Sequence, residues 1–181
     1  MIVLVFGIQG SGKSTHAHFI ANKLNIPYVS TGDLLREIEK EPTETGKKVR
    51  SLMEKGMIIP DEITVPALEN YLRENNFDDN FLIEGFPRTM KQVEMLNRKV
   101  DLVFEIVVPE EIAIKRLKER GRYDDIEDSI KTRLELFKEK TLPVIEHYKK
   151  SGTKVQIVNN DKSIVEVQKE IDELLKDKTR N

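Results

Sequence analysis

The stretch from residue 2 to residue 15 constrains the fold of this 181-residue chain more than any other feature. Residues 2–6 form an uninterrupted apolar run, which is typical of a parallel strand covered on both faces. Residues 7–15 then match the phosphate-loop pattern G-x-x-x-x-G-K-[S/T] at every fixed position, and residues 16–24 show the apolar spacing of a helix. A glycine-rich turn with an exposed lysine is the alternative, but strand, loop and helix in this order favour a phosphate-binding site.

The residue types in this loop suit a bound polyphosphate. Glycines let successive N–H groups point at one anion, and the N-terminus of the following helix adds partial positive charge. Lys13 is expected to neutralise the outer phosphates, and the hydroxyl of Ser14 is expected to ligate Mg²⁺.

Composition excludes several other classes of protein. The chain is long enough for one domain with a real core, and 30 Lys and Arg against 32 Asp and Glu leave a net charge of −2. That balance does not support non-specific nucleic-acid binding. The absence of cysteine excludes disulfides and thiolate metal sites and fits a reducing compartment. With no signal peptide and no apolar run of about 20 residues, we expect a cytoplasmic protein without a membrane span.

Strand and helix patterns alternate along the chain, which predicts an α/β fold. About five parallel strands with helices on both faces are expected, and ligands should gather at the carboxyl ends of the strands. The predicted strands are 2–6, 26–29, 81–83, 102–108 and 155–158. The predicted helices are 13–24, 61–75, 89–98, 110–119, 126–149 and 163–177.

Two segments interrupt this alternation. Residues 30–60 contain two helical stretches, 33–39 and 47–55, and no predicted strand, which suggests a small helical insertion over the top of the sheet. Residues 119–125 form a densely charged turn between two long helices, for which a solvated loop is the ordinary interpretation.

Three further motifs carry a resemblance to a known family. Besides the phosphate loop, these are residues 30–36, residues 84–89 with Gln92, and residues 122–125 with Arg133. In this order they resemble the adenylate kinases, within the nucleoside monophosphate kinase family, over essentially the whole chain. The resemblance implies a single P-loop three-layer kinase domain, 1–181, with a helical monophosphate-binding insertion at 30–60 and a short lid at 120–126. It also implies transfer of a phosphoryl group from MgATP to AMP.

The resemblance assigns roles residue by residue. ATP is expected at Gly10, Ser11, Gly12, Lys13, Ser14, Thr15, Arg120 and Lys162. AMP is expected at Thr31, Arg36, Met57, Ile58, Ile59, Gly85, Phe86, Pro87, Arg88, Gln92, Arg122 and Arg133. The residues expected to act in the transfer itself are Lys13, Arg88, Arg120, Arg122 and Arg133. Mg²⁺ is expected at Ser14 and Glu84, in part through water.

Physical chemistry supports the arginine assignments. Arg36 and Arg88 should rise to the rim that holds the phosphate loop, and guanidinium groups grip phosphate through two hydrogen bonds at once. A surface charge is the alternative for either arginine alone. Arg116 and Arg120 lie four apart on one helical face, where like charges repel. An anionic transition state would explain the cluster that they form with Arg122 and Arg133, and so would pairing with Asp124, Asp125 and nearby glutamates.

The chain departs from the family pattern at several positions. Gln9 replaces the usual proline of the loop, and Ser14 with Thr15 replaces the usual Gly-Thr. Glu84 stands where the family has Asp, and its extra methylene moves the carboxylate by roughly 1.5 Å. The short lid, without cysteine, leaves no place for a structural zinc.

The acceptor and the activity itself have alternatives. Thr31 and Thr89 stand where UMP/CMP kinases tend to have Ala and Asn, which favours AMP over UMP, CMP or deoxynucleotides. A nucleotide switch or ATPase module would need signatures that the chain lacks. A homologue that binds nucleotide without turnover is suggested only by Glu84 and the short lid. His16, His18 and His147 are interpreted as surface or packing residues, and a monomer is expected.

Overall fold

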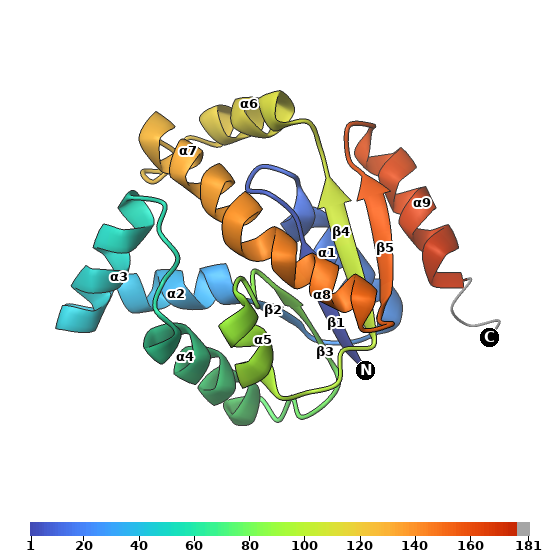
Figure 1. Ribbon diagram of the computed structural model, residues 1–181, viewed down its shortest axis with the longest axis horizontal. Helices are drawn as coiled ribbons and strands as arrows, with labels where there is room; N and C mark the ends of the chain where they lie inside the picture. The colour runs from blue at the N-terminus through green and yellow to red at the C-terminus, as the bar shows by residue number, and fades with distance from the viewer. Residues whose placement is uncertain (177–181) are drawn as a thin grey trace.

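The computed structural model describes residues 1–176, and its centre is a sheet of five parallel strands in the order β2-β3-β1-β4-β5 (Figure 1). The strands are β1 (Ile2–Phe6), β2 (Tyr28–Ser30), β3 (Phe81–Glu84), β4 (Leu102–Val107) and β5 (Lys154–Asn159). The chain leaves β1 toward β2 on one side of the sheet and later crosses to β4 on the other side. The edge beside the carboxyl end of β1 is therefore where an open α/β sheet binds its ligands.

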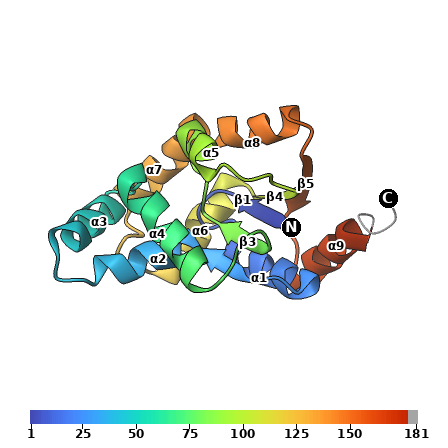
Figure 2. The same cartoon turned by 90° about the horizontal axis from the view of Figure 1, so that it is seen from below.

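Alternating side chains along β1 divide the core into two layers. Leu4 and Phe6 pack against α4 (Asp61–Glu74), α5 (Met90–Leu96) and α8 (Leu142–Lys150). Val3 and Val5 pack on the opposite face against α1 (Lys13–Leu24) and α9 (Ile164–Lys176). Figure 2 shows α5 and α8 on one side of the strands and α1 and α9 on the other. All four of these β1 side chains are at most 4% exposed, and burial of each contributes on the order of 2 kcal/mol.

Two short helices, α2 (Thr31–Glu39) and α3 (Glu44–Glu54), project from the carboxyl edge of the sheet and form a unit with its own small core. Each helix begins at a hydroxyl residue whose side chain accepts a backbone N–H, Ser30 for α2 and Thr43 for α3. The small core contains Leu35, Val49, Met53 and Ile59. On the other side of the same edge lie α6 (Glu110–Arg120) and α7 (Glu127–Leu136), which are joined by the 121–126 loop.

The α/β class, the parallel sheet and the flanking helices are confirmed, and the differences from the predicted elements are local. The second strand is 28–30 instead of 26–29, so its last residue falls inside the segment predicted to lack a strand. The helix predicted at 126–149 is wrong as one element: α7 is followed by a π-helical turn, η1 (Phe137–Thr141), and then by α8. Pro143 has no N–H for the carbonyl one turn back, so the hydrogen-bond ladder changes just before it. The helix predicted at 163–177 is described as 164–176, and residue 177 lies outside the described residues.

Candidate active site

Two glycines in the left-handed region fix the path of the phosphate loop between β1 and α1. Gly10 and Gly12 have φ values of +82° and +81°. A Cβ at Gly10 would lie 2.4 Å from the carbonyl oxygen of Ala113, and a Cβ at Gly12 would lie 2.3 Å from Nδ2 of Asn160. Glycine is therefore required at both positions, and the loop leads directly into the N-terminus of α1, where an anion is favoured.

Lys13 lies just inside this loop with its side chain only 14% exposed. Its Nζ is 3.5 Å from Oε1 of Glu84 and 3.5 Å from the carbonyl oxygen of Ile8. Burial lowers the pKa of the Lys13 amine, nearby Glu84 acts to raise it, and Arg88 lowers it again. A phosphate beside Lys13 would supply the negative charge that these surroundings lack.

The carboxylate of Glu84, at the end of β3, accepts from three hydroxyls of two elements, α1 and β2. Its Oε2 lies 3.3 Å from the hydroxyl of Tyr28 and 3.4 Å from the hydroxyls of both Ser14 and Ser30. Burial and the charge of Glu84 raise the pKa of the Tyr28 phenol, so this hydroxyl keeps its proton to donate. Carboxylate and hydroxyl oxygens are ligands that Mg²⁺ accepts, and Mg²⁺ keeps several waters, so Ser14 and Glu84 fit that ion.

The start of α2 is joined to the end of β3 through the main chain of Glu84. The hydroxyl of Thr31 donates to the main-chain carbonyl of Glu84 at 3.1 Å. Gly85 follows with φ +87°, and a Cβ there would lie 2.7 Å from Oγ1 of Thr31. The backbone of α2 and the backbone after β3 therefore approach each other as closely as glycine permits, at the edge where the sequence predicts the acceptor.

Arg88 is held in place by three contacts of its own backbone and side chain. Its Nε donates to the carbonyl of Gly85 at 2.8 Å, its backbone N–H donates to Oε1 of Gln92 at 2.7 Å, and its carbonyl accepts from the Thr141 hydroxyl at 3.1 Å. Burial lowers the pKa of the guanidinium, Glu84 acts to raise it, and other arginines lower it further. Within residues 1–176 the structure gives this guanidinium no ion pair with a carboxylate, so it is ready for an anion.

Gln92 is 1% exposed, so its side chain does not face solvent, as an ordinary polar helix residue would. Its amide nitrogen donates to Oδ1 of Asp61 at 2.8 Å, while its amide oxygen accepts from Arg88. An amide has two donor hydrogens and two acceptor lone pairs, so each end keeps one unused position. These unused positions could read the edge of an adenine, and the assignment of Gln92 to AMP stays a prediction.

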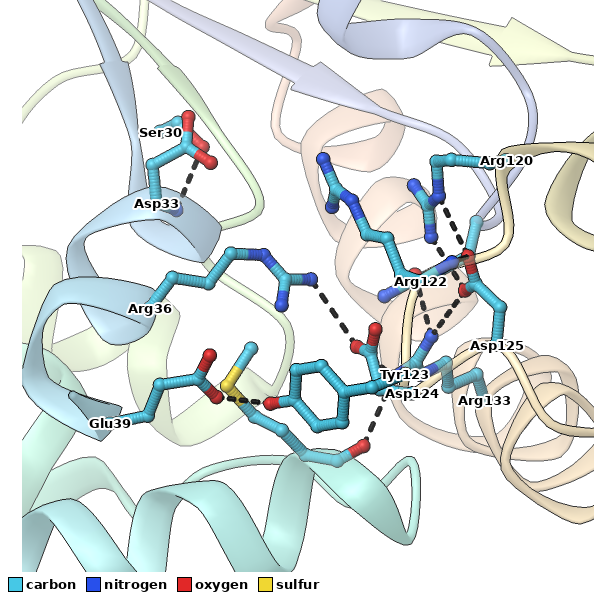
Figure 3. A network of polar contacts seen from close by, with 12 residues as sticks. Ser30, Asp33, Arg36, Glu39, Arg120, Arg122, Tyr123, Asp124, Asp125 and Arg133 are labelled. Atoms are coloured by element: carbon cyan, nitrogen blue, oxygen red, sulfur yellow. Dashed lines mark hydrogen bonds and ion pairs between the residues drawn. The ribbon is translucent and has the colours of Figure 1, made fainter.

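The remaining predicted arginines meet two aspartates of the 121–126 loop, as Figure 3 shows. Oδ2 of Asp124 lies 2.5 Å from Arg133 and 3.3 Å from Arg36, so one carboxylate joins α7 to α2. Burial acts to raise the pKa of Asp124, but Arg133 and Arg36 outweigh it and the pKa is lowered. Asp125 accepts two hydrogen bonds from Arg120, at 2.7 and 2.8 Å. Asp124 and Asp125 therefore pair with the arginines, as one of the two interpretations of the cluster predicts.

The tip of the same loop touches the α2–α3 unit directly. The hydroxyl of Tyr123 donates to Glu39 of α2 (Figure 3). The guanidinium of Arg50 in α3 lies 5.5 Å from the Tyr123 ring centre. Arg133 also donates to the carbonyl of Met53 at 3.0 Å. Arg122, by contrast, is exposed. Its backbone N–H donates to the Asp125 carboxylate at 3.2 Å, and its carbonyl accepts from the Asp125 backbone N–H at 2.9 Å.

One cavity of about 300 Å³ lies between these elements. Its lining includes the predicted site residues Lys13, Ser14, Arg36, Met57, Ile59, Glu84, Arg88, Arg120, Arg122 and Arg133. A smaller cavity of about 50 Å³ shares Lys13, Arg88 and Arg133 with it and adds Ile58, Gly85 and Pro87. The structure thus brings the phosphate loop, the start of α2, the end of β3 and the 121–126 loop onto one shared space.

Other predicted site residues lie apart from these cavities. Ser11, Thr31 and Phe86 are buried and do not line either cavity. Lys162 is exposed and pairs with Glu170 at 3.1 Å, so the structure does not bring it to the cavity. Thr15 is exposed at the start of α1. Among residues 1–176 there is no group of three or more His, Asp or Glu that could hold a metal and no helix that could span a bilayer.

A buried polar group that no sequence pattern predicts lies beneath the phosphate loop. Asn160 donates from Nδ2 to the carbonyl of Ser11 at 2.5 Å, and its Oδ1 lies 2.9 Å from Nε2 of His16. Its own carbonyl accepts from Arg116 at 3.0 Å, so Arg116 faces this group and not the other arginines. His16 is 1% exposed, which confirms packing and excludes a surface position. Asn160 directly follows β5, and it reaches the phosphate loop only once β5 is in the folded sheet. No local sequence pattern indicates this contact.

Comparison with known proteins gives a consistent result. The family model for adenylate kinase matches residues 5–153. An adenylate kinase of Thermobifida fusca is 42% identical over 163 residues, covering 84% of this chain and 86% of the relative. An adenylate kinase of Caldicellulosiruptor saccharolyticus is 34% identical, covering 94% and 97% respectively. One of Archaeoglobus fulgidus is 33% identical, covering 97% and 98%.

Proposed function

The chain belongs to the adenylate kinase family and is a phosphotransferase of the nucleoside monophosphate kinase class, and we propose that it transfers the γ-phosphoryl group of MgATP reversibly to AMP, giving two ADP. The observation that carries this proposal is the shared cavity. Lys13 of the phosphate loop and Arg88 after β3 both line it, so a donor phosphate on one and an acceptor phosphate on the other would meet there.

The donor occupies the phosphate-loop side in this proposal. The backbone around Gly10, Ser11 and Gly12, the amine of Lys13, and Ser14 with Thr15 at the start of α1 would hold the ATP phosphates. Arg120 approaches the same phosphates from α6. Lys162, two residues after the buried Asn160, would lie on the side of the donor nucleoside.

The acceptor occupies the side of the α2–α3 unit. Arg36 and Arg88 would grip the AMP phosphate, and Thr31 with residues 85–87 would line the approach. The backbone of residues 57–59 and the amide of Gln92 would contact the nucleoside. Acceptor phosphate is already ionised at neutral pH, so the reaction needs no general base.

Charge and position account for the transfer step. The transferring group is anionic throughout, and cations fixed around the cavity stabilise it without reorganising. Lys13, Arg88, Arg120, Arg122 and Arg133 supply these charges from five separate segments of the chain. When bound at Ser14 and Glu84, Mg²⁺ would neutralise part of the charge on the donor phosphates.

Two segments would close over the reactants. Residues 30–60 form the monophosphate-binding insertion and residues 120–126 the lid of a single kinase domain. Their contact through Tyr123, Glu39, Arg36 and Asp124 supports a closed arrangement that excludes water, which would otherwise hydrolyse ATP. We further propose that the enzyme acts in the cytoplasm as a monomer, on nucleotides and without a nucleic-acid partner.

Initial rates with ATP fixed and AMP, CMP, UMP or GMP as acceptor test this function. AMP should be preferred by a wide margin, with two ADP formed per AMP consumed. A strong preference for UMP or CMP would replace the proposed acceptor, and the absence of turnover with all four would leave a nucleotide-binding protein in place of the enzyme.

A further inference from the structure

We propose that Tyr28 is a positioning residue, whose hydroxyl holds the Glu84 carboxylate in place beside the phosphate loop. The inference rests on the proposed function, because it concerns how well Lys13 can serve a donor phosphate. Tyr28 belongs neither to the phosphate loop nor to the motifs that identify the acceptor side.

The backbone brings the two side chains together. Ser30 is paired with Glu84 in the parallel register of β2 and β3, and Tyr28 lies two residues earlier on the same face of β2. Both hydroxyls therefore reach one oxygen, Oε2, at 3.3 and 3.4 Å. The ring of His18 lies 3.8 Å from the Tyr28 ring between centres and limits where the phenol can point.

The contact depends on the length of glutamate. Withdrawing the carboxylate by the roughly 1.5 Å of one methylene would take Oε2 beyond hydrogen-bonding distance of the Tyr28 hydroxyl. Tyr28 can therefore bond to a glutamate at position 84 but not to an aspartate, and it holds Oε2 of Glu84 toward β2.

The other oxygen explains why this matters for the donor. Oε1 of Glu84 lies 3.5 Å from Nζ of Lys13, too far for a close ion pair. A carboxylate that loses one of its hydroxyl donors becomes a stronger acceptor for the remaining ones and is free to turn toward Lys13. A tighter pair would withdraw Lys13 from the donor phosphate. The acceptor side is linked to the main-chain carbonyl of Glu84 through Thr31, and this turn would not disturb that bond. Its other link, the Ser30 hydroxyl on Oε2, can rotate with the carboxylate.

Tyr28→Phe tests the proposal by equilibrium binding. Calorimetry with Mg²⁺ chelated should give ATP affinity weaker by about three- to tenfold, as expected for redistribution of one charge-assisted hydrogen bond. AMP affinity should stay within about twofold of the parent protein, since P-loop contacts are not involved in it. Tyr71→Phe makes the same chemical change on α4, away from Glu84, and should leave both affinities unchanged.

A double-mutant cycle with Glu84→Asp separates positioning from packing. Since aspartate cannot reach the Tyr28 hydroxyl, adding Tyr28→Phe to Glu84→Asp should cause no further loss of ATP affinity. Equal losses in both backgrounds, or equal losses of ATP and AMP affinity, would overturn the proposal. Binding needs no turnover, so a parent protein that binds ATP but transfers nothing would refute the proposed function and leave this test valid.

Discussion

Arg88 differs from Arg36, Arg120 and Arg133 in having no acidic partner among residues 1–176. Arg36 and Arg133 share Asp124, and Arg120 is paired with Asp125. The backbone and side chain of Arg88 are fixed by Gly85, Gln92 and Thr141, so its orientation is determined before any ligand arrives. A part-buried cation that is fixed in place and lacks an acid is what recognition of a phosphate requires.

Replacement of this side chain should affect the two substrates very differently. Arg88→Ala is expected to raise the KM for AMP on the order of 100-fold, because a bidentate charge-assisted contact is lost, while ATP affinity changes by less than about threefold. Steady-state kinetics with each substrate varied will measure both. Arg73→Ala, at an exposed arginine of α4, is the matched control. Equal losses for ATP and AMP would contradict the assignment.

Buried His16 should make the stability of the folded protein fall in mild acid, and a substitution at this position should remove that effect. Burial lowers the pKa of its imidazole, the Asn160 contact acts to raise it, and Arg116 lowers it. Below the unfolded value of about 6.5, the unfolded chain binds a proton that the folded protein resists, so stability falls as pH falls toward the lowered pKa.

His16→Gln is therefore expected to lose less stability than the parent between pH 7 and pH 5, because a glutamine amide can donate to Asn160 without titrating. Thermal melting across that range will show it, with the slope above pH 7.5 as the internal reference. Parallel melting curves for the two proteins at all pH values would show that His16 does not titrate as inferred.

At the scale of the elements, the sequence patterns predict what depends on neighbours in the chain. The run 2–6, the glycines of the phosphate loop and the amphipathic pattern of α2 are local features, and they fold as expected. The π-helical turn at 137–141 was missed because a helical pattern does not reveal where Pro143 disturbs the ladder. Asn160, Tyr28 and Thr141 were missed because their contacts are made across 50 or more residues by packing of the sheet and helices.

The π-helical turn ends at Thr141, whose hydroxyl donates to the carbonyl of Arg88. Thr141→Val keeps the shape but leaves that carbonyl without this donor, so we expect a loss of about 1–2 kcal/mol in the free energy of unfolding. Urea denaturation will measure it, and the KM for AMP should rise several-fold as Arg88 becomes less well fixed. Thr132→Val removes a hydroxyl that bonds to Asp128 at the surface of α7 and should cost less than about 0.5 kcal/mol. Equal effects at 132 and 141 would argue against a role for the π-helical turn.

At the scale of the whole molecule, Asp124 is the group that joins the 121–126 loop, α7 and the α2–α3 unit. Its side chain is 1% exposed and accepts from Arg36 and Arg133, two of the arginines assigned to the acceptor phosphate. The Asp124 carboxylate lies between two guanidiniums, where a phosphate anion could also bind. It thereby links Arg36 to a loop that lies more than 80 residues further along the chain. Three motifs predicted this meeting of segments, but the sequence left open whether the arginines would pair with aspartate or await a ligand.

Asp124→Asn tests whether those arginines can exchange one anion for another. Removal of the charge leaves Arg36 and Arg133 facing each other, and stability should fall by about 3–5 kcal/mol, as when one partner of a buried pair is lost. Added AMP would supply a phosphate to the same guanidiniums, so the rise in melting temperature at saturating AMP should be larger for Asp124→Asn than for the parent protein. Adenosine at the same concentration, which has no phosphate, is the control ligand and should not reproduce the difference. If AMP stabilises both proteins equally, the arginines bound by Asp124 do not contribute to the acceptor site.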